Sequence, residues 1–424
     1  MDAPIGVSRF FRTMATVGPS LSLAVTFAGR FILEKVRDLK QKLGFLQVDP
    51  ILDNRTATGV RMFDIEKTLE ECLAELPRND PREGRDSEEG PAFLTLAELI
   101  ADGIVAAHYQ AAAVYPDPAK LPAEVAMRSQ HAKGHGCVHA KFIVNDTLLP
   151  EVVAGAFVPG KSYDAVLRFS NAHENAQPDK TGDGRGVAIK LALPGVPDQQ
   201  DFILVNNPVF FVDNVAEYGR FMAIIHDRRY GGFVELLQIL FFFFSIPRGI
   251  RKFLVFFGLS RSKIADPFNA TYHSMSPYAL GDKLVVRYIV GPAKGTGVDE
   301  AERAVSEEES NYLRDRMRQR LLDGKSPVVL DFSVQIRDRA TVRDVERASR
   351  PWNRVADRIV PIARIEVPPQ NFTTADKFCN CEDMRFNPWH CLPEHRPLGG
   401  LNRSRLLAYR VSSRVRRRLN MVDT

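Results

Sequence analysis

The chain has 424 residues, of which 45% are hydrophobic, so it is long enough to bury one large core or two smaller ones. Its 57 Lys and Arg residues against 52 Asp and Glu residues give a net charge of only +5, and we expect no nucleic-acid partner. No apolar run approaches the roughly 20 residues that a membrane-spanning helix needs.

The cysteines are few and irregularly placed for a disulfide framework in so long a chain. We therefore expect a reducing compartment, the cytoplasm. The spacing of the C-terminal cysteines and histidines also departs from the paired spacing of zinc sites. The five cysteines are Cys72, Cys137, Cys379, Cys381 and Cys391.

The first part of the chain is mostly helical by its hydrophobic period. Leu21 to Leu33 indicates an amphipathic helix and not a signal peptide, because Arg30 interrupts the apolar run. A polar segment rich in Pro and Gly, Pro77 to Pro91, follows and indicates a linker. We expect two units, a helical N-terminal extension with its linker over 1–90 and one large domain over 91–424.

After this boundary the pattern becomes rich in β-branched and alternating apolar residues, which predicts strands. Helical periodicity then recurs in three places. Strands followed by helices indicate an α+β domain that is built around an antiparallel barrel. The predicted strands are Asp164 to Ser170, Val187 to Leu193, Phe202 to Val205, Leu284 to Val290, Val328 to Ile336 and Ile362 to Val367; the predicted helices are Val215 to Ile225, Glu300 to Leu322 and Ser404 to Leu419.

Three histidines, His131, His135 and His139, share parity and would line one face of a strand as a metal site. The intervening Gly134 and Gly136 favour a turn instead, so we do not expect a metal there.

The segment Phe233 to Leu259 carries more aromatic residues than one helix face requires. We favour apolar helices packed on the barrel or at a contact between subunits. The alternative is a peripheral membrane contact, with Arg248, Arg251 and Lys252 at the level of the lipid headgroups.

The last predicted helix carries Arg405, Tyr409 and Arg416, which are four and then seven residues apart and so share one face. A phenol titrates near pKa ~10, and adjacent positive charge favours its ionised form. This helix therefore presents a candidate phenolate ligand.

Four upstream segments carry further polar and aromatic residues in a fixed order. They are Arg128-Ser-Gln-His131-Ala-Lys-Gly, Arg168-Phe-Ser170-Asn, Asp183-Gly-Arg-Gly186-Val and Asn206-Asn207-Pro-Val-Phe210-Phe211. Together with Arg405-Leu-Leu-Ala-Tyr409, this series resembles the haem catalase family, densely from Arg128 to Tyr218 and again from Phe386 to Arg416. The resemblance implies a catalase-like antiparallel β-barrel with surrounding helices.

The resemblance also implies catalytic roles for three side chains. His131 matches the distal histidine, whose ordinary pKa near ~6.5 suits proton transfer. Ser170 matches the residue that hydrogen-bonds this imidazole. Asn206 is our choice for the amide that orients peroxide, with Val205 or Asn207 as alternatives, because this chain has Asn-Asn-Pro where catalases have Asn-Asn-Thr-Pro.

The implied cofactor is haem b, with Tyr409 as the iron ligand and Arg405 stabilising its phenolate. The propionates require cationic partners in an apolar cavity. The residues that would contact the cofactor are Arg128, Arg168, Gly186, Phe210, Tyr218, Arg405, Tyr409 and Arg416, with Tyr218 where catalases usually carry Phe.

The sequence leaves the substrate open. Gln130 precedes His131, where catalases have an apolar residue and the catalase-like allene oxide synthases have a polar Thr. We expect a catalase-like peroxidase, with a fatty-acid hydroperoxide isomerase or dehydratase as the alternative and a non-catalytic haem-binding protein as a third interpretation. Catalases commonly form tetramers, so the resemblance also implies a homo-oligomer.

Overall fold

The computed structural model describes residues 128–419, apart from 175, 196–199, 226–232, 294–309, 324–325, 338–339 and 353–356, together with part of 68–101. The predicted N-terminal helices before residue 68 and most of the predicted linker lie outside the described residues. The same holds for residues 300–309 of one predicted helix.

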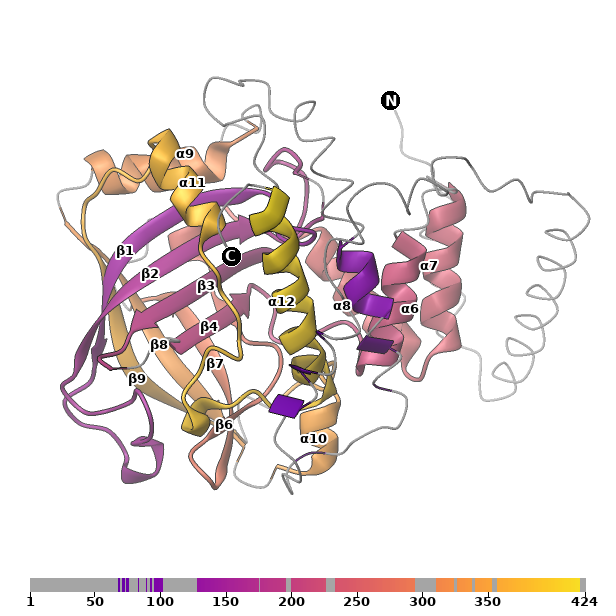
Figure 1. The fold of residues 1–424 in the computed structure, drawn as a ribbon, viewed down its shortest axis with the longest axis horizontal. Coiled ribbons are helices and arrows are strands. Elements are labelled where there is room, and N and C mark those ends of the chain that lie inside the picture. Colours follow the sequence, from indigo (N-terminus) through magenta and orange to yellow (C-terminus); the bar gives the residue numbers. More distant parts are fainter. Residues whose placement is uncertain are drawn as a thin grey trace, which may run out of the picture.

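A closed antiparallel barrel dominates the described part of the chain (Figure 1). The strands follow one another in the order β5-β4-β3-β2-β1-β9-β8-β7, and pairing of β5 with β7 closes the ring, while β6 extends the sheet beyond β7. Closure leaves the eight ring strands without a free edge. The strands are β1 (Gly134–Val144), β2 (Ser162–Asn171), β3 (Arg185–Ala192), β4 (Gln200–Val205), β5 (Tyr272–His273), β6 (Tyr278–Leu280), β7 (Leu284–Pro292), β8 (Val328–Ile336) and β9 (Arg358–Val367).

The barrel is the α+β architecture that the sequence predicted. Each of the six predicted strands overlaps an observed strand, whereas β1, β5 and β6 were not predicted. Val328–Ile336 is matched residue for residue, because its apolar residues alternate along its whole length. The barrel interior holds a cluster of aromatic residues in which Phe202 contacts Phe142, Phe332 and Tyr288. Such interdigitated rings fill the interior as a packed core.

The region of the three histidines corrects one prediction, because Gly134 and Gly136 lie in strand β1 and not in a turn. The register of β1 on β2 shifts between these two glycines, so the strand carries an irregularity at its start. As a result His135 is buried while His139 is exposed, and the shared parity does not place the three rings on one face.

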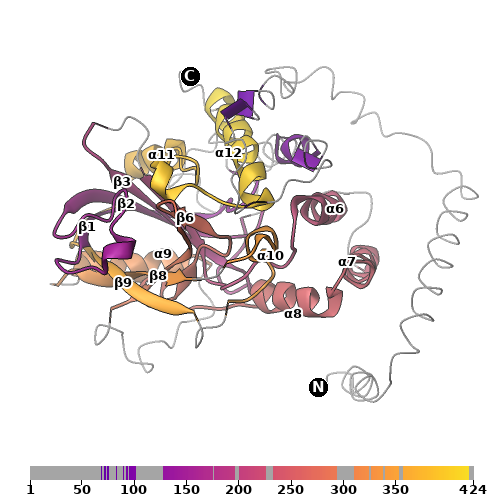
Figure 2. The same ribbon diagram turned by 90° about the horizontal axis from the view of Figure 1, so that it is seen from below.

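Helices cover one side of the barrel (Figures 1 and 2). Helix α12 runs along the barrel opening, α6 packs on α12, and α7 and α8 pack beside α6. A second core forms there, with Phe211, Phe221 and Phe243 at its centre. The helices are α6 (Val215–Ile225), α7 (Phe233–Ser245), α8 (Gly249–Ser260), α9 (Tyr312–Arg318, continued by a π-helical turn Gln319–Asp323), α10 (Val342–Glu346), α11 (Ala375–Asp383) and α12 (Gly400–Leu419).

The Phe-rich segment forms α7 and α8, and its Phe242, Phe243 and Ile246 belong to the second core together with residues of α6. The segment thus packs on a helix, whereas the favoured interpretation placed it on the barrel or at a contact between subunits. Their other faces expose large apolar side chains: Val234, Leu236, Phe241, Phe244, Ile250, Leu254 and Phe257. Among the described helices, none combines the length and the apolar character that crossing a bilayer would need.

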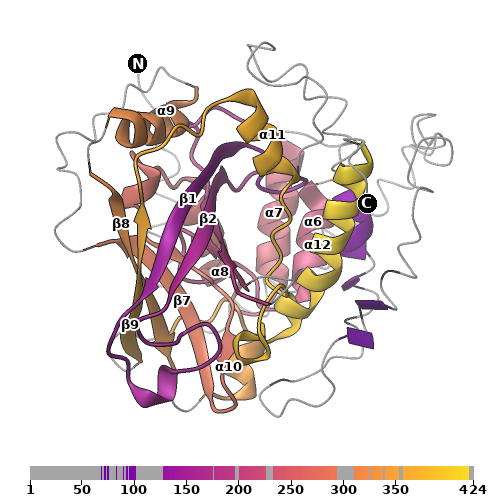
Figure 3. The same cartoon turned by 60° about the vertical axis from the view of Figure 1, so that its left-hand side comes forward.

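A disulfide that the cysteine count did not predict joins Cys137 on β1 to Cys381 on α11, across 244 residues of sequence. Figure 3 shows α11 lying next to the end of β1. The number and placement of the cysteines did not reveal this bond, because the two residues become neighbours only when α11 packs on the barrel. Cys72, Cys379 and Cys391 are free.

Candidate active site

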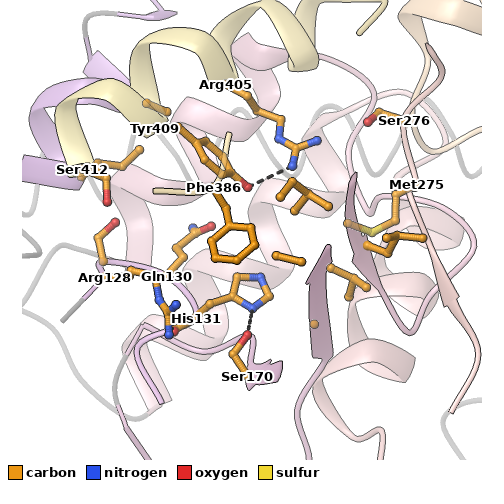
Figure 4. A pocket seen from close by; sticks show the side chains of 18 of the residues that line it. Arg128, Gln130, His131, Ser170, Met275, Ser276, Phe386, Arg405, Tyr409 and Ser412 are labelled. Atoms are coloured by element: carbon orange, nitrogen blue, oxygen red, sulfur yellow. Dashed lines mark hydrogen bonds between the residues drawn. The ribbon is translucent and has the colours of Figure 1, made fainter. Parts of the chain in front are cut away.

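A cavity with a free volume of about 210 Å³ lies between the barrel and α12. It contains ten of the eleven site residues that the sequence predicted, all except Asn206. Figure 4 shows Arg405 and Tyr409 on one side of the cavity and His131 with Ser170 on the opposite side. We call these the α12 side (Arg405, Tyr409 and Arg416) and the barrel side (His131, Ser170 and Gly186).

On the α12 side, the guanidinium of Arg405 donates to the phenol oxygen of Tyr409 over 2.9 Å. It also donates to Asn402 Oδ1 over 3.0 Å, which holds the guanidinium in place. Burial would lower the pKa of Arg405, but the oxygens of Tyr409 and Tyr278 raise it above its usual value. A permanent positive charge therefore lies beside the Tyr409 oxygen, as the four-residue spacing predicts.

On the barrel side, Nδ1 of His131 and Oγ of Ser170 are 2.9 Å apart. His131 has a φ of 59°, which non-glycine residues rarely adopt. Two hydrogen bonds maintain this backbone: the amide of His131 donates to Ala172 O over 3.1 Å, and Arg128 Nε donates to His131 O over 2.9 Å. The imidazole is thus fixed at both its backbone and its ring.

Gly186 lies directly behind the imidazole, because β3 pairs with β2 in a register that sets Gly186 opposite Ser170. A Cβ at residue 186 would lie 2.6 Å from Cε1 of His131, so only glycine fits this approach without displacement. The sequence placed Gly186 among the cofactor contacts, and in the structure its nearest neighbour is the histidine ring.

His131 is neutral in this pocket. Burial, followed by the positive charges of Arg128, Arg168 and Arg405, lowers its pKa to about 3. A neutral imidazole has one nitrogen free to accept a proton, which is the state that a general base requires.

Three nearly buried arginines, Arg128, Arg168 and Arg416, converge on the cavity with 7%, 8% and 4% of their surfaces exposed. Within the part of the chain that the structure describes, Arg128 Nη1 and Arg416 Nε have no hydrogen-bond partner. Unsatisfied buried guanidinium groups are costly, and anionic oxygens would satisfy them. The cluster is therefore built for an anionic ligand.

Two of the three departures from the family pattern that the sequence revealed, Gln130 and Tyr218, are in contact with each other. Gln130 Nε2 donates to the hydroxyl of Tyr218 and to the sulfur of Met222. Burial raises the pKa of Tyr218, which keeps this phenol neutral. Phe210 packs against the Tyr218 ring at 5.2 Å between centroids, and Gln130, Tyr218 and Phe210 all line the cavity.

The choice of Asn206 as the distal amide needs correction. Its Oδ1 accepts the backbone amide of Arg185 over 2.6 Å, and its Nδ2 donates to Ser262 Oγ over 2.9 Å. Both ends of the amide are therefore occupied by the neighbouring backbone and loop, away from the cavity. Of the two alternatives, Val205 lines the cavity and Asn207 does not. The amide that does line it is Gln130.

Sequence reasoning missed several residues of the site. Phe386 lines the cavity and lies 4.3 Å from the Arg168 guanidinium, measured to the ring centroid. Met275 also lines it, with a strained φ of 56° between Ser274 and Ser276. Glu382 is fully buried and pairs with Arg128 over 3.2 Å. The only signal for any of them in the sequence is that the family resemblance resumes at Phe386.

The closed antiparallel barrel and its flanking helices define the class of fold, and comparison with known proteins agrees with it. The family model for catalase matches residues 123–423. This chain belongs to the catalase family. No curated protein matches it.

Solved structures of catalases share the fold at low identity. Catalase A from Saccharomyces cerevisiae is 18% identical with a TM-score of 0.55, over 70% of this chain and 64% of that one. A bacterial catalase is 21% identical with a TM-score of 0.55, over 70% and 60%. A fungal catalase is 18% identical with a TM-score of 0.51, over 69% and 59%. The matches thus span about 60% of the length of these catalases.

Proposed function

We propose that this chain is a haem-dependent, peroxide-processing oxidoreductase that binds haem b in the cavity between the barrel and α12. The single observation that carries the proposal is the arrangement of an Arg405–Tyr409 pair on one side and a His131–Ser170 pair on the other. Membership of the catalase family, whose members typically bind haem, supports it.

The residues present fit this cofactor. Haem carries two propionates, and Arg128 and Arg416 each have a buried donor without a partner in the described residues. Phe210 and Tyr218 supply aromatic surface for the macrocycle. Bound haem would supply the iron at which the O–O bond of a peroxide is cleaved.

Tyr409 is the proposed iron ligand, because it lines the cavity from the α12 side and accepts a hydrogen bond from Arg405. A phenolate is an anionic oxygen donor, and the positive charge of Arg405 lies next to this oxygen. The arginine also fixes the direction of the phenol oxygen, which keeps the ligand oriented in the absence of the cofactor.

His131 is the proposed general base and acid. Its neutral ring would take the proton of a hydroperoxide and return it to the departing oxygen. Ser170 holds the ring through Nδ1, which leaves Nε2 available for proton transfer.

The first test is an absorption spectrum of the purified protein that was produced with ample haem. A Soret band with the ferric features of tyrosinate ligation is expected. Oxygen release or oxidation of an organic donor, measured after mixing with hydrogen peroxide, then tests the reaction. A colourless protein would refute the proposal.

A second candidate function is isomerisation or dehydration of a fatty-acid hydroperoxide. The hydrogen-bonded Gln130–Tyr218 pair favours it, because this pair makes one part of the cavity polar, whereas catalases have apolar residues there. Gln130 would also supply the amide that Asn206 does not provide. Measuring lipid products from a fatty-acid hydroperoxide, against oxygen release from hydrogen peroxide, separates the two functions. Abundant oxygen without lipid turnover would exclude this candidate.

Contact with a membrane surface through Phe233–Leu259 belongs to the same candidate, since it would bring an apolar substrate to the protein. The exposed apolar side chains of α7 and α8 and the exposed Arg248 and Arg251 support it. Lys252, the third cation of the prediction, is buried and pairs with Glu217, so it does not belong to this surface. Replacing Leu236, Phe244 and Leu254 with Ser should abolish sedimentation with anionic vesicles, whereas Ile359→Ser, an exposed residue of β9, should not. Equal sedimentation of both variants would refute the contact.

Two further expectations are part of the proposal. Self-association is common in the family, and the molar mass in solution, measured by light scattering, tests it.

We also propose that residues 91–424 form the haem domain and 1–90 an extension. Glu83 and Glu89, which lie just before this boundary, both pair with Arg403 of α12. Limited proteolysis near residue 90 tests the division.

A further inference from the structure

The end of α11 contacts all three arginines of the nearly buried cluster, Arg128, Arg168 and Arg416. The backbone oxygens of Cys381 and Met384 accept hydrogen bonds from Arg168 over 3.4 and 3.0 Å. The backbone oxygen of Glu382 accepts one from Arg416, and its side chain pairs with Arg128 over 3.2 Å. One four-residue segment, Cys381 to Met384, therefore fixes the whole arginine cluster.

This segment is attached to the barrel covalently, because Cys381 is bonded to Cys137 on β1. Next to that bond, Gly134 makes room for the carboxylate: a Cβ at residue 134 would lie 2.4 Å from Glu382 Oε1. Glu382 is 0% exposed, so neither water nor another conformation screens its charge. The disulfide fixes the segment, and the absence of a side chain at Gly134 leaves space for the carboxylate of Glu382 next to Arg128.

The geometry of Arg128 shows what this contact achieves. Its Nε donates to the carbonyl of His131 over 2.9 Å and its Nη2 to Glu382, while Nη1 has no partner in the described residues. A planar guanidinium that is fixed at two nitrogens has its third nitrogen fixed as well. Glu382 thereby positions the free donor of Arg128 relative to the distal histidine.

Glu382 also sets the charge of the cluster. Counted by themselves, the three nearly buried guanidiniums and the one fully buried carboxylate of this cluster carry a net charge of two. Burial, followed by the like charge of the neighbouring Arg128, lowers the pKa of Arg416 to about 10, so like charges already repel one another here. A ligand with two carboxylates would neutralise the net charge of the cluster, and a ligand without carboxylates would leave that charge in place.

We propose that Glu382, held in place by the Cys137–Cys381 bond, is a positioning residue that orients Arg128 and matches the cavity to a ligand with two carboxylates. The inference deepens the proposed function, since the two propionates of haem are such a pair. It does not depend on the iron, because it concerns only the carboxylate end of the ligand.

The test uses metal-free protoporphyrin IX and its dimethyl ester, which have the same ring but two carboxylates or none. Binding is followed by porphyrin fluorescence on the full-length protein. The native protein should bind the diacid at least about tenfold more tightly than the ester, since only the diacid satisfies the buried donors. Equal affinities would overturn the proposal.

Glu382→Gln keeps the shape and the acceptor but removes the charge. Without a ligand, its melting temperature should fall, because three like charges are left uncompensated. Its affinity for the diacid should rise about tenfold, while that for the ester stays constant. Glu151→Gln, which removes a carboxylate from an exposed pair with Arg358, should change neither quantity. The proposed role would be contradicted if the melting temperature and the diacid affinity of Glu382→Gln both stayed unchanged. A weaker diacid affinity in this variant would contradict it as well.

The double variant Cys137→Ser with Cys381→Ser should lose about tenfold in diacid affinity, because the segment is no longer fixed to β1. Cys379→Ser, on the same helix but outside the bond, is the control. Reduction of the native protein by a phosphine gives the two thiols without a substitution, and should weaken diacid binding equally. Unchanged binding after reduction would show that the bond does not position the cluster. If the native protein binds the diacid but gives no haem spectrum, the proposed function is refuted and the role of Glu382 is not.

Discussion

The two sides of the cavity are built in different ways. The α12 side takes its residues from one helix, where Arg405 and Tyr409 are neighbours at four-residue spacing. The barrel side takes its residues from three segments that meet only because the strands pair in one register, with Ser170 opposite Gly186 and Gly134. The α12 side therefore depends on local helical geometry, and the barrel side on long-range pairing.

The largest expected effect is on the barrel side. His131→Ala should reduce the rate of peroxide consumption by about 10²–10⁴-fold, because the proton transfer group is lost. Haem binding, followed by the Soret band, should persist, since the ring that is removed is not the proposed iron ligand. Retained peroxide consumption would remove His131 from the mechanism.

A change at Gly186 tests how closely the barrel side is packed. Gly186→Ala places a Cβ 2.6 Å from the His131 ring, and the displaced imidazole should lower the rate by about 10²-fold. Gly258→Ala on α8 is the matched control, because a Cβ there meets no atom within 4 Å. If both variants turn over peroxide equally, the barrel side tolerates displacement of the ring.

On the α12 side, Tyr409→Phe removes the oxygen without disturbing the helix. Haem affinity should fall by roughly 10–100-fold and the ferric spectrum should change, because the proposed ligand is lost. Titration with haem measures the affinity, and Tyr163→Phe, on β2 and outside the cavity, is the control. An unaltered spectrum would assign the iron ligand to another residue.

The smallest effect is a dependence of stability on pH, and it compares strand β1 of the barrel with α12. Burial lowers the pKa of His135 on β1 to about 4, whereas α12 contains no histidine. A group with a lowered folded pKa contributes stability above its unfolded pKa near ~6.5, and this is lost as the pH falls towards the folded value. At pH 5.5 the loss should be about 1 kcal/mol.

The unfolding free energy, measured by urea denaturation between pH 7 and pH 4, tests this. His135→Gln keeps a donor for Asn171, which lies 2.8 Å from Nε2, and should make the profile less steep, while His131 and His395, whose pKa values are also lowered, retain their share of the slope. The same slope in both proteins would assign the acid sensitivity to other groups.

The sequence predicted most of the fold and many cavity residues, but not every contact. It placed strand Val328–Ile336 and helix Val215–Ile225 correctly, because their periodicity is local. It missed strand β1, because two glycines at its start resemble a turn when the partner strand is unknown. It chose Asn206 from the order of residues, although hydrogen bonds to Arg185 and Ser262 turn that amide away.

By itself, the sequence determined which residue types were available and which of them share a helix face, because helical spacing is fixed over a few residues. Only the tertiary structure decided that Gln130 contacts Tyr218, that Cys137 bonds to Cys381 and that Glu382 lies against Arg128. These residues are separated by 88, 244 and 254 positions. Contacts at such separations depend on strand register and on the packing of helices onto the barrel, which no local pattern encodes.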